Sequence, residues 1–272
     1  MEHVFRVKKF PDAKSMGIQA AAEAGELLRD YTGRGKRVVA VFAAAPSQDA
    51  FLEQLAVEKD IDWGMVEAFH LDEYHDLPEG HPNTFELYLR EHIFGKVPIP
   101  DENVKYIKTL KGSPDEVAAG YSRGLKSAVQ KAGKEGGLYI NFIGIGVNGH
   151  IAFNEPGADM WTDKWMAPIE IDDVSVKQQF DDYKNHPNPQ ARYANMRDVP
   201  RKALTMTPAA ILASDIIFAM VPGEQKANAV KASIEGPVTE KVPASLLRLH
   251  ENTTIFIDAE SGRGLTRKPA AG

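Results

Sequence analysis

The chain has 272 residues, of which 43% are hydrophobic, 8% aromatic and 26% charged, the composition of an ordinary globular protein. Its 32 lysines and arginines against 38 aspartates and glutamates give a formal charge of −6, which argues against a nucleic-acid partner because phosphate backbones require a basic surface. The chain contains no cysteine, which excludes disulfides, thiolate nucleophiles and cysteine-ligated zinc or iron–sulfur sites.

The sequence has no features of a membrane or secreted protein. No stretch approaches the roughly 18 apolar residues of a membrane span, and residues 1–9 contain no apolar run of signal-peptide length. We therefore expect a cytoplasmic protein that has no membrane partner. At about 150 residues per domain the length allows one large α/β domain or two small ones, and we expect a single domain over residues 1–272.

Hydrophobic periodicity predicts alternating helices and strands. In chain order these are a helix at 11–31, a strand at 36–43, a helix at 47–58, a strand at 66–71, helices at 83–94 and 114–132, strands at 138–145 and 216–221, a helix at 225–234 and a strand at 254–258. Helix-length segments between strands indicate crossover connections. The predicted fold class is therefore α/β: three-layer and Rossmann-like, with a mainly parallel, doubly wound sheet and helices on both faces.

Two segments fall outside this alternation. Residues 156–200 carry Pro, Asp, Asn and Gln without a clear period, and we expect them to leave the sheet. Residues 261–272 are small and basic, and we expect a frayed end.

Polar residues follow two of the predicted strands. Asp72 begins the cluster after the strand at 66–71, and a glycine-rich run that includes His150 and Glu155 follows the strand at 138–145. Ligands in a doubly wound sheet bind beyond the carboxyl ends of the strands. A carboxylate can abstract a proton next to a carbonyl while an imidazole transfers a proton to an oxygen. Each residue alone is more often a turn, a cap or scaffold, so the prediction rests on the combination.

The glycine-rich run also matches the pattern G-x-G-x-x-G at Gly144, Gly146 and Gly149. A dinucleotide-binding site requires that a helix start directly after these glycines. Here residues 154–157, Asn-Glu-Pro-Gly, are typical of a turn instead. We therefore expect a tight glycine turn and no nicotinamide cofactor.

Six segments closely resemble the glucosamine-6-phosphate deaminase/isomerase family of the 6-phosphogluconolactonase-like superfamily. They are FHLDEYHDLP at 69–78, HPNTF at 81–85, GIGVNGHIAFNEP at 144–156, GEQKANAV at 223–230, EGPVT at 235–239 and PASLLRLH at 243–250. They cover nearly the whole chain in the family's order. The related 6-phosphogluconolactonases end their glycine–histidine stretch with a Ser-Leu-Phe-Pro type of sequence, whereas Phe-Asn-Glu-Pro at 153–156 is the deaminase form.

The resemblance implies a hydrolase and isomerase that converts glucosamine 6-phosphate and water to fructose 6-phosphate and ammonia with no metal and no cofactor. It implies that Asp72 is the base that moves a proton from C2 to C1 of the open-chain sugar. His150 matches the residue that protonates the ring oxygen, and Glu155 matches the carboxylate that orients and charges His150. Lys226 matches a lysine that contacts the substrate phosphate.

Two departures from the family pattern lie in the predicted catalytic and phosphate loops. Asn148 stands where many members carry aspartate, and we expect it to hydrogen-bond His150 without adding charge. The usual Thr-Gly-Ser-Thr/Ser-Pro phosphate loop is here Ala-Ala-Ala-Pro-Ser-Gln at 43–48. In this loop Ala45 offers only its main chain, Pro46 removes one donor and Ser47 keeps the one hydroxyl.

A third departure concerns the positive charge beside the phosphate. The family's phosphate-binding arginine is replaced by Gln178 or Gln179. Lys226 is then expected to carry the cationic side of the site, with help from a residue that the sequence does not place. Arg192, Arg197 and Arg201 are candidates.

Three functions remain open at this point. The amino-sugar phosphate deaminase/isomerase is favoured. A divergent relative acting on another sugar or sugar phosphate, lactone hydrolysis included, is motivated by the altered phosphate loop. A non-catalytic sugar-phosphate sensor would have no need of Asp72, His150 and Glu155 together. The expected partner is a small sugar phosphate, and the sequence leaves open whether the chain forms a homo-oligomer.

Overall fold

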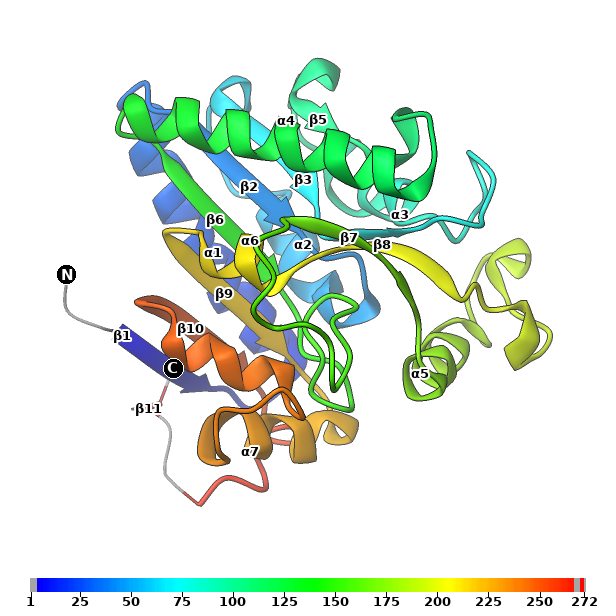
Figure 1. The fold of residues 1–272 in the computed structure, drawn as a ribbon. Coiled ribbons are helices and arrows are strands. Elements are labelled where there is room, and N and C mark those ends of the chain that lie inside the picture. The colour runs from blue at the N-terminus through cyan, green and yellow to red at the C-terminus, as the bar shows by residue number, and fades with distance from the viewer. Residues whose placement is uncertain (1–3, 267–269, 272) are drawn as a thin grey trace.

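The computed structural model describes residues 4–266 and 270–271, which form two sheets with helices around them (Figure 1). Within these residues the larger sheet has eight strands in the order β11-β1-β10-β9-β6-β2-β3-β5, all paired in parallel. Their bounds are β1 Val4–Lys9, β2 Val38–Phe42, β3 Val66–His70, β5 Val104–Lys105, β6 Leu138–Ile143, β9 Ile216–Val221, β10 Asn252–Ile257 and β11 Ala270–Ala271. The predicted mainly parallel sheet is therefore confirmed.

Helices cover both faces of this sheet (Figure 1). Because side chains alternate along a strand, Val38, Ala40 and Phe42 of β2 pack with α1 and α2, whereas Val39 and Val41 pack with α4. The helices are α1 Ala13–Gly33, α2 Asp49–Leu55, α3 Phe85–Leu89, α4 Pro114–Lys134, α5 Asp173–Tyr183, α6 Pro208–Leu212 and α7 Ala227–Glu235. This arrangement confirms the three-layer, doubly wound α/β fold.

The order of the strands creates a crevice between β2 and β6. From β2 the chain proceeds outward to β3 and β5 on one side, and it then returns to β6 on the other side of β2. The connections that follow β2 and β6 therefore leave in opposite directions, and ligands bind at such a point in doubly wound folds. Both strands are buried along their whole length, which holds their carboxyl ends in fixed positions.

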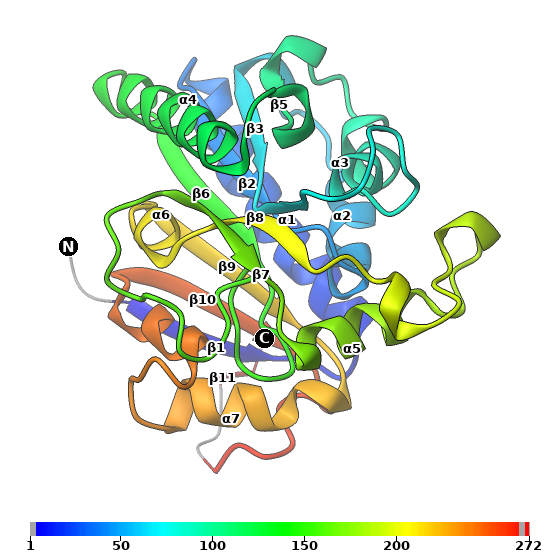
Figure 2. The same ribbon diagram turned by 45° about the vertical axis from the view of Figure 1, so that its right-hand side comes forward.

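A second, antiparallel sheet lies beside the carboxyl ends of the first (Figure 2). It consists of β4 Asp72–Tyr74, β8 Lys202–Met206 and β7 Met166–Glu170, in the order β4-β8-β7. The expectation that residues 156–200 leave the main sheet is confirmed. The second sheet itself was not predicted, because β4 has three residues and its partner β8 lies more than a hundred positions later in the chain.

The C-terminal segment differs from the expected frayed end where the structure describes it. Ser261 is buried, donates its main-chain N–H to Asp258 Oδ1 at 2.7 Å and accepts a hydrogen bond from the main-chain N–H of Asp258. Residues 270–271 pair with β1, and residues 267–269 and 272 lie outside the described residues. None of the helices within 4–266 and 270–271 is both long and apolar enough to cross a membrane.

Candidate active site

A pocket opens at the crevice beyond β2 and β6. The predicted residues Asp72, His150, Ala45, Ser47 and Lys226 all line it. The other lining residues are Ala43, Ala44, Leu71, Phe85, Gly144, Ile145, Gly146, Ala152, Phe153, Gln178 and Gln179. The structure therefore brings together residues that lie up to 183 positions apart in the chain, counted from Ala43 to Lys226.

The glycine-rich run after β6 forms the tight turn expected from the sequence. The main-chain N–H of Gly149 donates to the carbonyl of Gly146 at 3.0 Å, and that of Gly146 donates to the carbonyl of His150 at 2.9 Å. Gly149 has φ 87°, in the left-handed region that favours glycine. A β-carbon at Gly146 would overlap with the His150 ring, so this glycine leaves room for the imidazole.

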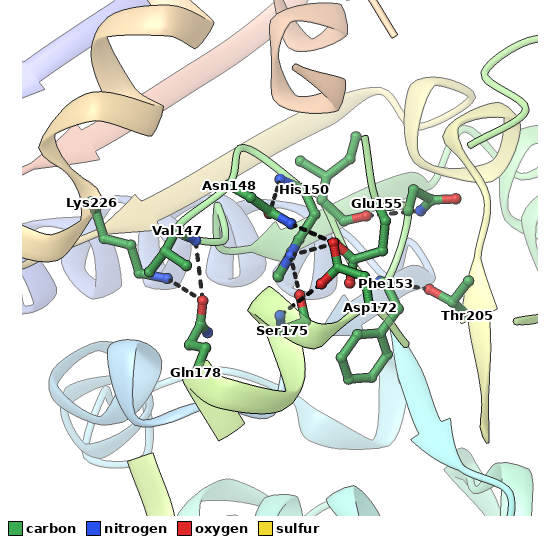
Figure 3. Close-up of polar contacts among 12 residues, drawn as sticks. Val147, Asn148, His150, Phe153, Glu155, Asp172, Ser175, Gln178, Thr205 and Lys226 are labelled. Carbon is green, nitrogen blue, oxygen red and sulfur yellow. Dashed lines mark hydrogen bonds and ion pairs between the residues drawn. The ribbon is translucent and has the colours of Figure 1, made fainter. Parts of the chain in front are cut away.

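His150 is held at one ring nitrogen and faces the pocket with the other (Figure 3). Its Nδ1 lies 3.2 Å from Glu155 Oε2 and 2.9 Å from the Ser175 hydroxyl. Within the described part of the chain, no residue hydrogen-bonds its Nε2. The imidazole can therefore exchange a proton with a ligand through Nε2 while Glu155 and Ser175 keep its orientation.

Glu155 is an ionised partner for His150. Burial raises the pKa of Glu155, but hydrogen bonds from His150, Ser175 and Asn148 outweigh that effect and lower the pKa overall. A carboxylate that stays ionised beside an imidazole stabilises the imidazolium. This arrangement supports the role of orienting and charging His150 that the resemblance implied for Glu155.

Asn148 connects two carboxylates behind His150. Its Oδ1 accepts the main-chain N–H of His150 at 3.1 Å, so Asn148 contacts the main chain of His150 and not its ring. Its Nδ2 donates to Glu155 Oε2 at 2.7 Å and to Asp172 Oδ2 at 3.2 Å. An aspartate at this position would place three carboxylates together with no donor between them. Asn148 therefore supplies the donor that Glu155 and Asp172 share.

Ser175 and Asp172 are site residues that sequence reasoning missed. Both belong to the start of α5, where Asp172 caps the helix by accepting the main-chain N–H of Ser175 at 2.7 Å. The spacing of Asp172 and Ser175 is a helix-start signal that could have been identified in the sequence. The contact of Ser175 with His150 could not have been identified in the sequence, because it depends on how α5 packs against the glycine loop.

We expect the Ser175 hydroxyl to position His150. Replacing Ser175 by alanine removes one of the two partners of Nδ1, so kcat is expected to fall by up to about tenfold, the range of a single neutral hydrogen bond, with KM little changed. Ser175→Thr should restore most of kcat, and Ser122→Ala on α4 serves as the control. Equal kcat for Ser175→Ala and the unaltered enzyme would contradict this role.

Asp72 begins β4 and is buried at the pocket wall. Burial, reinforced by repulsion from Glu73, raises its pKa well above the ordinary value. A carboxylate with a raised pKa is a stronger proton acceptor when it is ionised. The neighbouring Glu73 does not line the pocket, because strand residues alternate in direction. Its carboxylate instead accepts the main-chain N–H groups of Phe85 and Glu86 at the start of α3.

The loop after β2 offers main-chain donors. Among the described residues, none accepts a hydrogen bond from the main-chain N–H of Ala45 or of Ser47, and both residues line the pocket. Pro46 has no N–H. Ser47 provides the hydroxyl of this loop, which accepts a hydrogen bond from Gln48 Nε2 at 3.0 Å. Unpaired N–H groups at the wall of a pocket can bind an anion.

Lys226 is the lysine of the pocket and is almost fully buried. Burial lowers its pKa to about 8, while the nearby carboxylate of Asp182 acts in the opposite direction. Its Nζ donates to Gln178 Oε1 at 3.2 Å. A buried ammonium with a lowered pKa is stabilised when an anion binds beside it.

The three arginines named as candidates to assist Lys226, Arg192, Arg197 and Arg201, do not lie at the pocket. Arg192 donates to the carbonyl of His186, and Arg201 pairs with Asp173 at the surface. The segment between α5 and β8 extends outward from the rest of the molecule (Figure 2). Both glutamines at 178 and 179 do line the pocket.

Within residues 4–266 and 270–271, no three His, Asp or Glu side chains are grouped so that they could hold a metal ion. What the site does contain is a buried carboxylate, an oriented imidazole and a buried ammonium around one pocket. This set can transfer protons to and from a small anionic ligand.

The chain is similar in sequence to proteins of one family. The family model described as glucosamine-6-phosphate isomerases/6-phosphogluconolactonase matches residues 11–256. The glucosamine-6-phosphate deaminase of Lactobacillus helveticus is 31% identical over 256 residues, which cover 92% of this chain and 95% of the relative. That of Lactobacillus acidophilus is 32% identical over 257 residues, with the same coverage of 92% and 95%.

Solved structures show the same fold. A monomeric glucosamine-6-phosphate deaminase superposes with a TM-score of 0.83 at 23% identity, covering 96% of this chain and all of the neighbour. A 6-phosphogluconolactonase from Trypanosoma brucei superposes with a TM-score of 0.74 at 15% identity, covering 97% of this chain and all of the neighbour. The chain therefore belongs to the family of glucosamine-6-phosphate isomerases and 6-phosphogluconolactonases.

Proposed function

We propose that this enzyme converts glucosamine 6-phosphate and water into fructose 6-phosphate and ammonia. The observation that carries the proposal is that Asp72 and His150, from separate parts of the chain, line one pocket, with Glu155 against the inner nitrogen of His150. The deaminases among the relatives, about a third identical over most of the chain, also support it.

The proposed reaction uses the two proton-transfer groups in turn. His150 Nε2 gives a proton to the ring oxygen as the bond from that oxygen to C1 breaks, and the C1 hydroxyl releases its proton to solvent, which leaves an open-chain aldehyde. Asp72 then takes the proton from C2 while the aldehyde oxygen takes one from solvent, which gives an enolamine. Asp72 returns its proton to C1, which leaves a protonated imine at C2. Water adds to the imine carbon and ammonia departs, so the net change is isomerisation with hydrolytic loss of the amine.

The test is an assay of ammonia release by the purified chain. Glucosamine 6-phosphate, galactosamine 6-phosphate and unphosphorylated glucosamine are compared, with 6-phosphogluconolactone hydrolysis measured in parallel. We expect ammonia and fructose 6-phosphate in equal amounts from the first substrate, with and without a chelator. Lactone hydrolysis without ammonia release would reject the proposal in favour of the other activity of the family.

Lys226 is proposed to bind the 6-phosphate, and this predicts a dependence on pH. Since Lys226 has a pKa of about 8 in the free enzyme, it loses its charge as the pH rises above that value. The kcat/KM for glucosamine 6-phosphate should therefore decline above about pH 8, because kcat/KM reports ionisations of the free enzyme. Lys226→Ala should raise KM at least about tenfold, or roughly 1.4 kcal/mol, and should abolish this decline.

The control for Lys226 is Lys231→Ala on the next turn of α7, where the lysine pairs with Glu235 away from the pocket. This variant should keep both KM and the pH profile. An unchanged KM in Lys226→Ala would remove the lysine from the phosphate site.

We also propose that the enzyme acts in the cytoplasm on a small sugar phosphate, without nucleic acid or membrane. The lack of cysteine and the acidic composition support this. Whether copies of the chain associate stays a prediction, and sedimentation of the purified chain would decide it.

A further inference from the structure

The side chain of Gln178 joins three separate parts of the site (Figure 3). It projects from α5, and its Oε1 accepts a hydrogen bond from Lys226 Nζ at 3.2 Å. The same oxygen accepts the main-chain N–H of Val147 in the glycine loop at 3.1 Å. One carbonyl oxygen therefore binds both the lysine of the pocket and an N–H of the catalytic loop.

The orientation of this amide is determined by its neighbours. Lys226 Nζ and the N–H of Val147 are both donors, so the group that faces them has to be the carbonyl oxygen. Gln178 also counteracts the effect of burial on the pKa of Asp182, one turn later on α5. The two donors thus direct the oxygen of the amide at Lys226 and Val147.

Lys226 Nζ and the main-chain N–H of Val147, which both donate to this oxygen, could equally donate to an oxygen of a phosphate. An ammonium and a main-chain N–H are typical phosphate ligands. The unpaired N–H groups of Ala45 and Ser47 lie at the wall of the same pocket. Gln178 adds no positive charge to these donors. Its neutral carbonyl oxygen instead accepts a hydrogen bond from Lys226, the lysine proposed to bind the substrate phosphate.

We propose that Gln178 is a specificity-determining residue whose carbonyl oxygen stands in for a phosphate oxygen on Lys226 and Val147. A phosphorylated sugar then has to displace this oxygen before its phosphate reaches Lys226, whereas an unphosphorylated sugar does not. The contact therefore weakens the preference of the pocket for phosphorylated substrates. The inference rests on the proposed function for the identity of the sugar. The effect of Gln178 on phosphate binding can be measured without any turnover.

The first experiment measures the binding of inorganic phosphate to the full chain by titration calorimetry. Gln178→Met keeps the length of the side chain without its acceptor, and Gln178→Ala removes both. We expect each variant to bind phosphate at least about fivefold more tightly than the unaltered protein, since Lys226 loses a competing acceptor. Gln178→Glu should bind phosphate at least about tenfold more weakly, because its carboxylate pairs with the lysine.

The control is Gln190→Ala, an exposed glutamine on the segment after α5, which should bind phosphate as the unaltered protein does. Weaker phosphate binding in Gln178→Met and Gln178→Ala overturns the proposal, because it would mean that the Gln178 amide donates a hydrogen bond to the phosphate. Unchanged phosphate binding in the two variants also overturns it, because Gln178 would then have no effect on phosphate. Absence of phosphate binding in every variant overturns it as well.

The second experiment compares substrates. Gln178→Met should lower KM for glucosamine 6-phosphate relative to KM for glucosamine, so that the preference for the phosphorylated sugar rises at least about fivefold. A loss of kcat with both sugars would instead indicate a structural role for Gln178 and overturn the proposal. Tighter phosphate binding in a chain that releases no ammonia would reject the proposed function while the inference about Gln178 stands.

Discussion

Replacing Asp72 by asparagine is expected to reduce kcat for glucosamine 6-phosphate by at least about 100-fold, the lower range for loss of a general base. The amide has nearly the same shape as the carboxyl but cannot accept the C2 proton. Ammonia release by Asp72→Asn is compared with that by Asp76→Asn, which alters an exposed carboxylate four residues later in the chain. A normal kcat in a correctly folded Asp72→Asn protein would exclude Asp72 as the base.

The same substitution should make the protein more stable at neutral and alkaline pH. Burial and the nearby Glu73 raise the pKa of Asp72 in the folded state, so folding disfavours its ionised form. The unaltered protein is therefore most stable at low pH, where Asp72 is protonated in both states. Its free energy of unfolding falls as the pH rises from the pKa of Asp72 in the unfolded chain towards the raised pKa of Asp72 in the folded protein. Asparagine carries no charge at any pH, so urea unfolding should show the difference between the two proteins growing with pH.

His150→Gln is expected to reduce turnover of glucosamine 6-phosphate by about 100- to 10,000-fold, because glutamine cannot give a proton to the ring oxygen. The loss should be smaller for a substrate that needs no ring opening. A glucosamine 6-phosphate methylated on its 5-hydroxyl cannot close the pyranose ring and provides this comparison. The pattern separates the ring-opening step, assigned to His150, from the proton transfer at C2, assigned to Asp72.

The control for His150 is His186→Gln on the segment after α5, outside the pocket. It should leave both substrates unaffected. An equal loss for the cyclic and the open-chain substrate would mean that His150 is needed beyond ring opening, and the division of roles between His150 and Asp72 would then be wrong.

Much of the site could be predicted from the sequence because its central residues lie next to strong local signals. The strands β3 and β6 are apolar runs, and the residues that follow them must lie at the carboxyl edge of the sheet. This local reasoning placed Asp72, His150 and Glu155 at that edge, and in the structure Asp72 and His150 line one pocket. The resemblance to the family added Ser47 and Lys226 and the role of each residue, and these roles await the experiments above.

The contacts of α5 with the pocket were decided by the tertiary structure. Ser175 contacts His150, and Gln178 contacts Lys226, only because α5 packs beside the glycine loop, and no local pattern encodes the distance between the two segments. The arginines that were candidates for the phosphate site lie outside the pocket for the same reason, because no local pattern in the sequence shows where their segment packs. Arg201, for example, pairs with Asp173 at the surface. The sequence by itself determined the mainly parallel character of the larger sheet and the glycine turn, because each follows from neighbouring residues, whereas the roles of Asp72, His150 and Glu155 stay predictions. The tertiary structure decided which side chains complete the site, because a side chain from a distant segment acts there only when packing brings it within hydrogen-bonding distance.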